Sequence, residues 1–137
     1  MTTIRDDAIL RLEVVEAQNL PNRQHKVVAK LGKAKAESNF QNGTEPIWNQ
    51  AMTFDVKTEE EPFVISVVDN FGTTVLSESI RLKDHKEYRD MEKLIWLPKG
   101  DLRSEFDPRL RVKIIYNYSH IQKYDNMKEE KKKEIKA

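Results

Sequence analysis

Apolar and polar residues alternate most regularly between Trp48 and Val56. The apolar positions of one parity are Trp48, Met52, Phe54 and Val56, and the polar positions of the other are Asn49, Thr53 and Asp55. Alternation with a period of two that includes aromatic residues predicts a strand with one buried face. Because each aromatic ring buries roughly 150–250 Å², we expect the other strands to pack around this one. Ahead of it, Asn42-Gly43 predicts a tight turn with both residues at positive φ.

Apolar runs recur along the rest of the chain at intervals typical of short strands. They cover residues 8–16, 27–31, about 33–40, 63–69, 74–82, 94–97 and 110–116. Residues that favour turns separate these runs, and no connection has room for the crossover helix that parallel strands need. The pattern therefore predicts an all-β fold, an eight-stranded antiparallel β-sandwich.

Two segments carry helical signals. Asp84 followed by Glu87 resembles a capping pair, which predicts a short helix within residues 83–93, between the sixth and seventh strands. From Ser119 the chain becomes strongly charged, which predicts a charged helical tail that is marginal alone and either frays or is held by something outside the sandwich. Its candidate docking residues are Ile121, Tyr124 and Met127. We therefore divide the chain into a β-sandwich at 1–118 and a tail at 119–137.

Composition narrows the classes of function. Of the 137 residues 34% are charged, yet the net charge is only +1, so we expect no binding to nucleic acid. The absence of cysteine excludes disulfides and favours a reducing compartment. No apolar run approaches the ~18 residues of a spanning helix. We expect an intracellular, cytoplasmic protein, either peripheral to a membrane or part of a large complex.

No catalytic constellation stands out. His25, His85 and His120 lie in separate parts of the chain. The sequence has no cysteine nucleophile, no glycine-rich phosphate loop and no spacing typical of metal ligands. We therefore expect no enzyme, no catalytic residue and no cofactor.

Several phrases, taken in order, resemble the C2 domain family over roughly residues 8–118. The run Leu12 to Leu20 is similar to the first strand of that family, which usually ends in Ala-x-Asn-Leu, and 27–32 is similar to its second strand. Glu45-Pro46-Ile47-Trp48-Asn49 followed by 52–56 is the most specific match, and 64–69 and 110–116 fit later strands. The resemblance implies an eight-stranded antiparallel sandwich whose loops at one end often bind Ca²⁺ and then an anionic membrane.

The same resemblance shows where this chain departs from its family. A Ca²⁺ site of that kind needs about five aspartates from two loops, because Ca²⁺ takes six to eight oxygen ligands. The first loop, 21–26, has no acidic residue, and Gln24 stands where an aspartate is expected. The other loop keeps Asp69 but lacks the later acids. We therefore interpret Asp69 as a remnant of a degenerate calcium site and expect no metal.

Two functions fit this interpretation. The first is a calcium-independent C2 module that binds a protein, as an adaptor or as a structural subunit of a larger assembly. The second is calcium-independent targeting to anionic phospholipids through a basic strand face. The candidate lipid- or partner-binding residues are Lys30, Lys33, Lys35, Arg111, Lys113 and Phe71. Several cations are needed, because each contributes about 1 kcal/mol near an anionic leaflet, and Glu37 on the same face weakens the patch.

Overall fold

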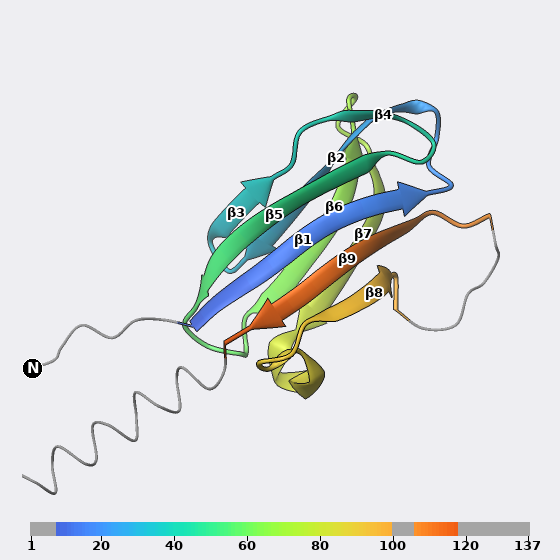
Figure 1. Ribbon diagram of the computed structural model, residues 1–137. Coiled ribbons are helices and arrows are strands. Elements are labelled where there is room, and N and C mark those ends of the chain that lie inside the picture. The colour runs from blue at the N-terminus through green and yellow to red at the C-terminus, as the bar shows by residue number, and fades with distance from the viewer. Residues whose placement is uncertain (1–7, 100–105, 118–137) are drawn as a thin grey trace, which may run out of the picture.

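Nine strands and two short 3-10 helices follow one another along residues 8–99 and 106–117, the parts of the chain that the computed structural model describes (Figure 1). The strands are β1 (Ala8–Gln18), β2 (Arg23–Leu31), β3 (Ala34–Glu37), β4 (Gln41–Gly43), β5 (Ile47–Val56), β6 (Pro62–Asp69), β7 (Thr74–Arg81), β8 (Lys93–Leu97) and β9 (Arg109–Tyr116). The helices η1 (Leu82–Asp84) and η2 (Lys86–Tyr88) lie between β7 and β8. None of the helices in these ranges has the length and apolar character needed to span a membrane.

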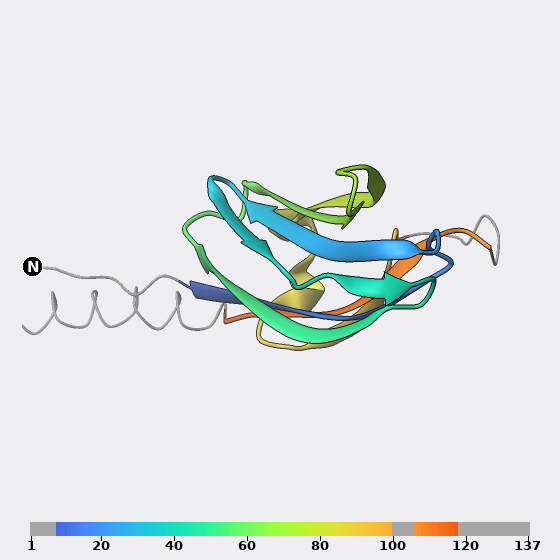
Figure 2. The same ribbon diagram turned by 90° about the horizontal axis from the view of Figure 1, so that it is seen from above.

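The strands form two sheets that pack face to face. One sheet has the order β5-β1-β9-β8, and the other has the order β3-β2-β6-β7, with β4 also pairing with β2. Every pairing between named strands is antiparallel. The two layers are visible in Figure 2, where the molecule is seen from above. The predicted antiparallel β-sandwich is therefore confirmed.

The core lies between the sheets and is filled by alternate residues of the long strands. Buried members from β1 and β9 are Leu10, Leu12, Val14, Leu110, Val112, Ile114 and Tyr116. Phe54 of β5 and Phe63 of β6 meet across the core with ring centroids 5.4 Å apart and planes inclined at 69°. This edge-to-face geometry is the one that the charge distribution of aromatic rings favours.

The strand β5 buries the four apolar residues that its alternation predicted, Trp48, Met52, Phe54 and Val56. Its place in the sheet differs from the prediction, because β5 is an edge strand and β1 and β9 lie at the centre. One-sided burial is compatible with either place, since alternation reports which face is covered and says nothing about the number of neighbouring strands.

The predicted turn at Asn42-Gly43 is wrong. Only Gly43 has a positive φ, at 99°, and Gln41–Gly43 forms β4, which pairs with Arg23–His25 at the start of β2. The strand β2 accordingly begins at Arg23, within the segment predicted to be a loop at 21–26. Sequence reasoning missed this part of β2 because its inward-facing residue is His25, a polar residue, where an apolar one was expected.

The segment predicted to contain a short helix forms two consecutive 3-10 turns, η1 and η2. Neither turn has a side-chain hydrogen bond at its N-terminal cap, so the expected capping role of Asp84 is wrong. Instead, Leu82 and Tyr88 are buried and attach the segment to the core. The predicted tail helix at 119–137 lies outside the described residues.

A β-bulge interrupts the pairing of β5 with β1. Val14 is opposite Gln50 and Glu16 is opposite Ile47, so two residues of β5 stand against one of β1. One of these two, Asn49, has φ at 47°. Asparagine tolerates this left-handed conformation better than most residues, so the sequence accommodates the bulge.

A polar cluster joins three segments at the end of the sandwich where β6 begins. Arg89, just after η2, donates hydrogen bonds to both carboxylate oxygens of Glu59, at 3.0 and 2.6 Å. The hydroxyl of Tyr116, at the end of β9, donates to the same carboxylate and accepts a bond from Arg89. The paired, hydrogen-bonded charges tie the β5–β6 connection to the last strand.

Candidate binding site

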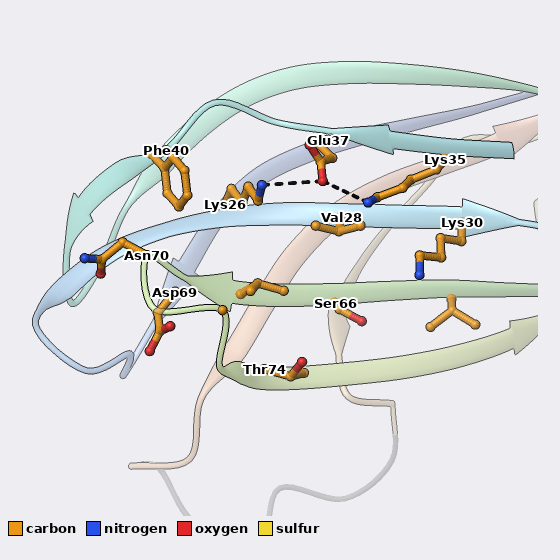
Figure 3. Close-up of a pocket in the computed structure, with 13 residues that line it drawn as sticks. Lys26, Val28, Lys30, Lys35, Glu37, Phe40, Ser66, Asp69, Asn70 and Thr74 are labelled. Carbon is orange, nitrogen blue, oxygen red and sulfur yellow. Dashed lines mark ion pairs between the residues drawn. The ribbon is translucent and has the colours of Figure 1, made fainter.

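A groove of about 490 Å³ runs along the outer face of the β3-β2-β6-β7 sheet (Figure 3). The alternation of β2 decides which of its residues reach this face. His25, Val27 and Ala29 face the core, so Lys26 and Lys30 lie on the outer face. The lining residues are Lys26, Val28, Lys30, Lys35, Glu37, Phe40, Val64, Ser66, Val68, Asp69, Asn70, Gly72 and Thr74. The groove therefore combines an apolar floor with basic walls.

The charges in the groove are partly neutralised by Glu37. The carboxylate of Glu37 lies 3.4 Å from Lys26 Nζ and 3.2 Å from Lys35 Nζ, as the dashed lines in Figure 3 show. The hydrogen bond from Lys35 and the charge of Lys26 lower the pKa of Glu37 below its ordinary value, so the carboxylate is ionised at neutral pH. Within the described ranges, Lys30 has no ion pair. The three groove lysines and the single carboxylate of Glu37 therefore leave a net charge of +2.

The ring of Phe40 forms a wall near Lys26, whose ammonium group lies 5.1 Å from the ring centroid. At this distance a lysine is attracted electrostatically to the face of the ring. Phe40 is half-exposed, as is typical of a residue at the rim of a groove. The rim therefore offers an aromatic surface next to a cation.

At one end of the groove, Asp69 is buried and holds three hydrogen bonds. Its Oδ1 accepts bonds from the backbone N–H groups of Phe71 and Thr73, at 2.9 and 2.8 Å. Its Oδ2 accepts a bond of 2.8 Å from Arg23 Nη1. Burial alone raises the pKa of this carboxyl, but the bonds from Thr73 and Arg23 outweigh burial and hold the pKa below its usual value. Asp69 is consequently an ionised internal anchor of the β6–β7 loop.

His25 lies beside Asp69 in the pairing of β2 with β6 and is fully buried. Neither ring nitrogen has a hydrogen-bond partner within the described part of the chain. Burial lowers the pKa of His25, and the nearby carboxylate of Asp69 only partly offsets this effect. The imidazole is therefore neutral at physiological pH, so it adds no charge to this end of the sandwich.

The predicted binding residues are distributed over both sheets. Lys30 and Lys35 line the groove, whereas Lys33 lies in the turn between β2 and β3 and does not line it. Phe71 is in the β6–β7 loop and is 75% exposed, with the guanidinium of Arg23 5.6 Å from its ring centroid. The three proposed tail-docking residues, Ile121, Tyr124 and Met127, lie outside the described residues.

The prediction that Arg111 and Lys113 extend the face of Lys30 is wrong. Both residues belong to β9, in the opposite sheet, and their side chains lie on its outer face. The cause is topological: β2 and β9 have the same alternation, but sequence alone does not assign a strand to one of the two layers. The outward orientation predicted for the two residues within β9 is nevertheless confirmed.

Sequence reasoning did not include Lys26 and Phe40 among the binding residues. Lys26 was placed in a loop because the strand was expected to begin at Val27. Its parity with Lys30, four residues along the same strand, is the signal that finds it once the strand is extended.

The metal-ligating residue types His, Cys, Asp and Glu form no group of three or more anywhere in the described ranges.

Comparison with solved structures finds the same sandwich in other proteins. The paired C2 domains of Extended-Synaptotagmin 2 match with a TM-score of 0.69 at 21% identity, over 84% of this chain and 42% of that one. A C2 domain of a plant Extended Synaptotagmin 1 matches with a TM-score of 0.66 at 21% identity, over 83% of this chain and 97% of that one. Human GIVD cytosolic phospholipase A2 matches with a TM-score of 0.67 at 16% identity, over 82% of this chain and 16% of that one.

At these identities the structural matches show a shared fold. The chain spans less than half of the first of these structures. Comparison with curated protein sequences gives no match. The C2 domain profile matches residues 8–84, more than half of the 137-residue chain. With the sandwich topology already described, this match establishes that the chain belongs to the C2 domain family.

Proposed function

We propose that this chain is a calcium-independent C2 module without catalytic activity, which works by binding a partner protein as an adaptor or structural subunit. The observation that carries the proposal is the ion pair between Arg23 Nη1 and Asp69 Oδ2, at 2.8 Å. It places a fixed cation beside the one carboxylate that the chain retains from the acidic loops of its family.

The residues around Asp69 do not fit a calcium ion. Ca²⁺ requires six to eight oxygen ligands, several of them carboxylates. Both oxygens of Asp69 already accept hydrogen bonds, from Arg23, Phe71 and Thr73. A Ca²⁺ ion at Oδ2 has to displace the guanidinium of Arg23, and the positive charges of the ion and the guanidinium repel each other. The buried neighbour His25 supplies nitrogen, which Ca²⁺ does not favour.

The groove charges favour a protein partner over a lipid surface. Glu37 forms ion pairs with both Lys26 and Lys35. The three groove lysines, including Lys30, and this single carboxylate together leave a net charge of +2. Binding to an anionic leaflet through charge alone needs several uncompensated cationic groups, at about 1 kcal/mol each. A protein surface can match a pattern of mixed charges and also cover the apolar floor.

Membrane binding is the second candidate function, and two exposed features favour it. Lys30 points into the groove without an ion-pair partner among the described residues, and the exposed ring of Phe71 stands at the tip of the β6–β7 loop. In this alternative, Lys30, Lys33 and Lys35 contact anionic head groups while Phe71 enters the interface. If this alternative holds, replacing the groove lysines by glutamate weakens binding to anionic membranes.

Calcium titration and vesicle sedimentation test these functions on the full chain. Isothermal titration with Ca²⁺ is expected to give no binding heat, and sedimentation with phosphatidylserine or phosphoinositide vesicles is expected to be weak and unchanged by chelator. Binding of Ca²⁺ by the unmodified chain contradicts the proposal. Calcium-independent binding to vesicles that is lost in Lys30→Glu/Lys35→Glu, but kept in the control Lys57→Glu/Lys86→Glu, supports the membrane function instead.

A further inference from the structure

Trp96 lies on the outer face of the β5-β1-β9-β8 sheet, away from the core. Its neighbours in β8, Ile95 and Leu97, pack inward against the core. The guanidinium carbons of Arg109 and Arg111 lie 4.4 and 5.5 Å from the centroid of the indole ring. These two residues are two apart in β9 and therefore share the outer face with Trp96. The indole thus lies within cation–π distance of both guanidinium groups.

Neither guanidinium has a carboxylate partner among residues 8–99 and 106–117. Arg109 donates from Nε and Nη2 to the amide oxygen of Gln18, at 2.9 and 2.6 Å, which fixes its orientation without neutralising its charge. The structure gives Arg111 the ring of Trp96 as its contact. Glu16 is opposite Arg111 in the pairing of β1 with β9, but it forms no ion pair with it. Both arginines are half-buried, so each stays partly accessible to solvent.

The rest of this face carries exposed apolar area and charges of both signs. Leu94, two residues before Trp96 in β8, is 47% exposed. Lys113, beside Leu94, forms an ion pair with Glu13 at 3.6 Å. This pair places a carboxylate beside the basic residues of the face, which opposes contact with a uniformly anionic membrane plane. A peptide can place carboxylates over the arginines alone.

We propose that the β8–β9 patch, defined as Leu94, Trp96, Arg109 and Arg111, docks an acidic segment of a partner protein. Carboxylates of Asp or Glu in that segment pair with the two guanidinium groups, whose planar forks match carboxylate geometry, and a neighbouring apolar side chain covers Leu94. Tryptophan and arginine are also the residue types enriched among those that dominate binding energy at protein interfaces. This inference rests on the proposed protein-binding function and adds to the groove a second binding surface, in the opposite sheet.

Selection of a displayed library of random peptides, about twelve residues long, on the full chain tests the proposal. Enriched peptides are expected to contain paired Asp or Glu residues next to an apolar residue. Arg109→Glu/Arg111→Glu is expected to weaken their binding about tenfold or more, because it replaces attraction with repulsion. The control Lys57→Glu/Lys86→Glu makes the same change in charge at exposed positions outside both the patch and the groove and is expected to leave binding within about twofold. Thermal unfolding of each variant verifies that it folds.

Arg109→Lys/Arg111→Lys keeps the charge and removes the planar fork, so it is expected to bind more weakly than the unmodified chain and more tightly than the glutamate variant. An enriched set of neutral or basic peptides overturns the inference, as does equal binding to the glutamate variant or an absence of enrichment. Peptides that depend on Lys30 and Lys35 instead leave the proposed function intact and refute only this surface. Binding of anionic vesicles that requires Arg109 and Arg111 identifies a membrane and also refutes it.

Discussion

Arg23 Nη1 donates a hydrogen bond of 2.8 Å to Asp69 Oδ2 and so ties the start of β2 to the end of β6. The carboxylate side chain is completely buried, whereas the guanidinium side chain is 45% exposed. The pair therefore lies at the boundary between core and solvent, where the arginine stays hydrated while it compensates a buried charge. This arrangement gives the β6–β7 loop an internal cation.

Arg23→Ala is expected to lower the free energy of unfolding by about 1–3 kcal/mol, because a buried carboxylate loses one of its three hydrogen-bond donors. Urea denaturation at neutral pH measures the change. The matched control is Arg11→Ala, which removes an exposed arginine paired with Glu13 at 3.2 Å. Surface pairs contribute about 0–1 kcal/mol, so the control is expected to cost less. Equal losses in the two variants contradict this account of Asp69.

Stability is expected to fall as the pH falls below about 6.5, the ordinary pKa of histidine. Burial lowers the pKa of His25 in the folded chain, with Asp69 raising it and Arg23 acting in both directions. The unfolded chain therefore binds more protons than the folded chain in that range, and the stability that is complete above the unfolded pKa is lost as the pH falls. Urea denaturation at several pH values above and below that point measures the slope.

His25→Leu is expected to flatten this slope, because leucine does not titrate. At neutral pH the substitution is expected to cost less than about 1 kcal/mol, since it removes two buried nitrogen atoms that lack partners in the described part of the chain. His85→Leu provides the comparison, because His85 lies in the η1–η2 segment near the surface and pairs with Glu87 at 2.9 Å. A slope that persists in His25→Leu assigns the pH dependence to other groups.

Phe63→Ala is expected to destabilise the fold by about 3–5 kcal/mol, because it leaves a cavity opposite the ring of Phe54. Phe71→Ala removes the same side chain from the exposed loop tip and is expected to cost less than about 1 kcal/mol. The difference between the midpoints of thermal unfolding checks both values. Comparable losses in the two variants place Phe71 in a packed environment and contradict the described exposure.

Arg89→Met is expected to lower the free energy of unfolding by about 1–3 kcal/mol, because Glu59 and the hydroxyl of Tyr116 lose their shared donor. Guanidinium chloride denaturation measures the loss. Lys83→Met is the control, since the ammonium of Lys83 lies 3.7 Å from Glu60 and both side chains are largely exposed. Its effect is expected to stay within about 0.5 kcal/mol. A small effect of Arg89→Met indicates that water replaces the hydrogen bonds that Arg89 donates to Glu59 and Tyr116.

The sequence predicts the core of this protein well, because burial imposes a period of two on each strand. Trp48, Phe54, Leu110 and Ile114 all face inward as their parity indicates. Strand order is a different matter, since it depends on which strand pairs with which. The edge position of β5 was therefore missed although its buried face was identified.

The binding surfaces were predicted less completely for the same reason. Lys30 and Lys35 were placed on one face by the resemblance to the C2 family, and the pairing of β2 with β3 sets them opposite each other. Arg111 was assigned to their face although β9 belongs to the other layer. The ion pair of Asp69 was not predicted, because the lack of acids near Gln24 was apparent in the sequence but the contact of Arg23 with Asp69 was not. That contact requires β2 to start at Arg23. The sequence did not indicate this start, because the inward-facing residue there is the polar His25.

The bulge at Asn49 has a consequence for how the protein behaves in crowded solution. The ten-residue strand β5 leaves one edge without a strand neighbour in the described ranges, and such edges recruit strands from other molecules and seed aggregates. A kink at Asn49 breaks the straight row of backbone groups that an incoming strand has to match. The bulge at Asn49 therefore opposes edge-to-edge pairing between molecules, which a regular edge strand permits.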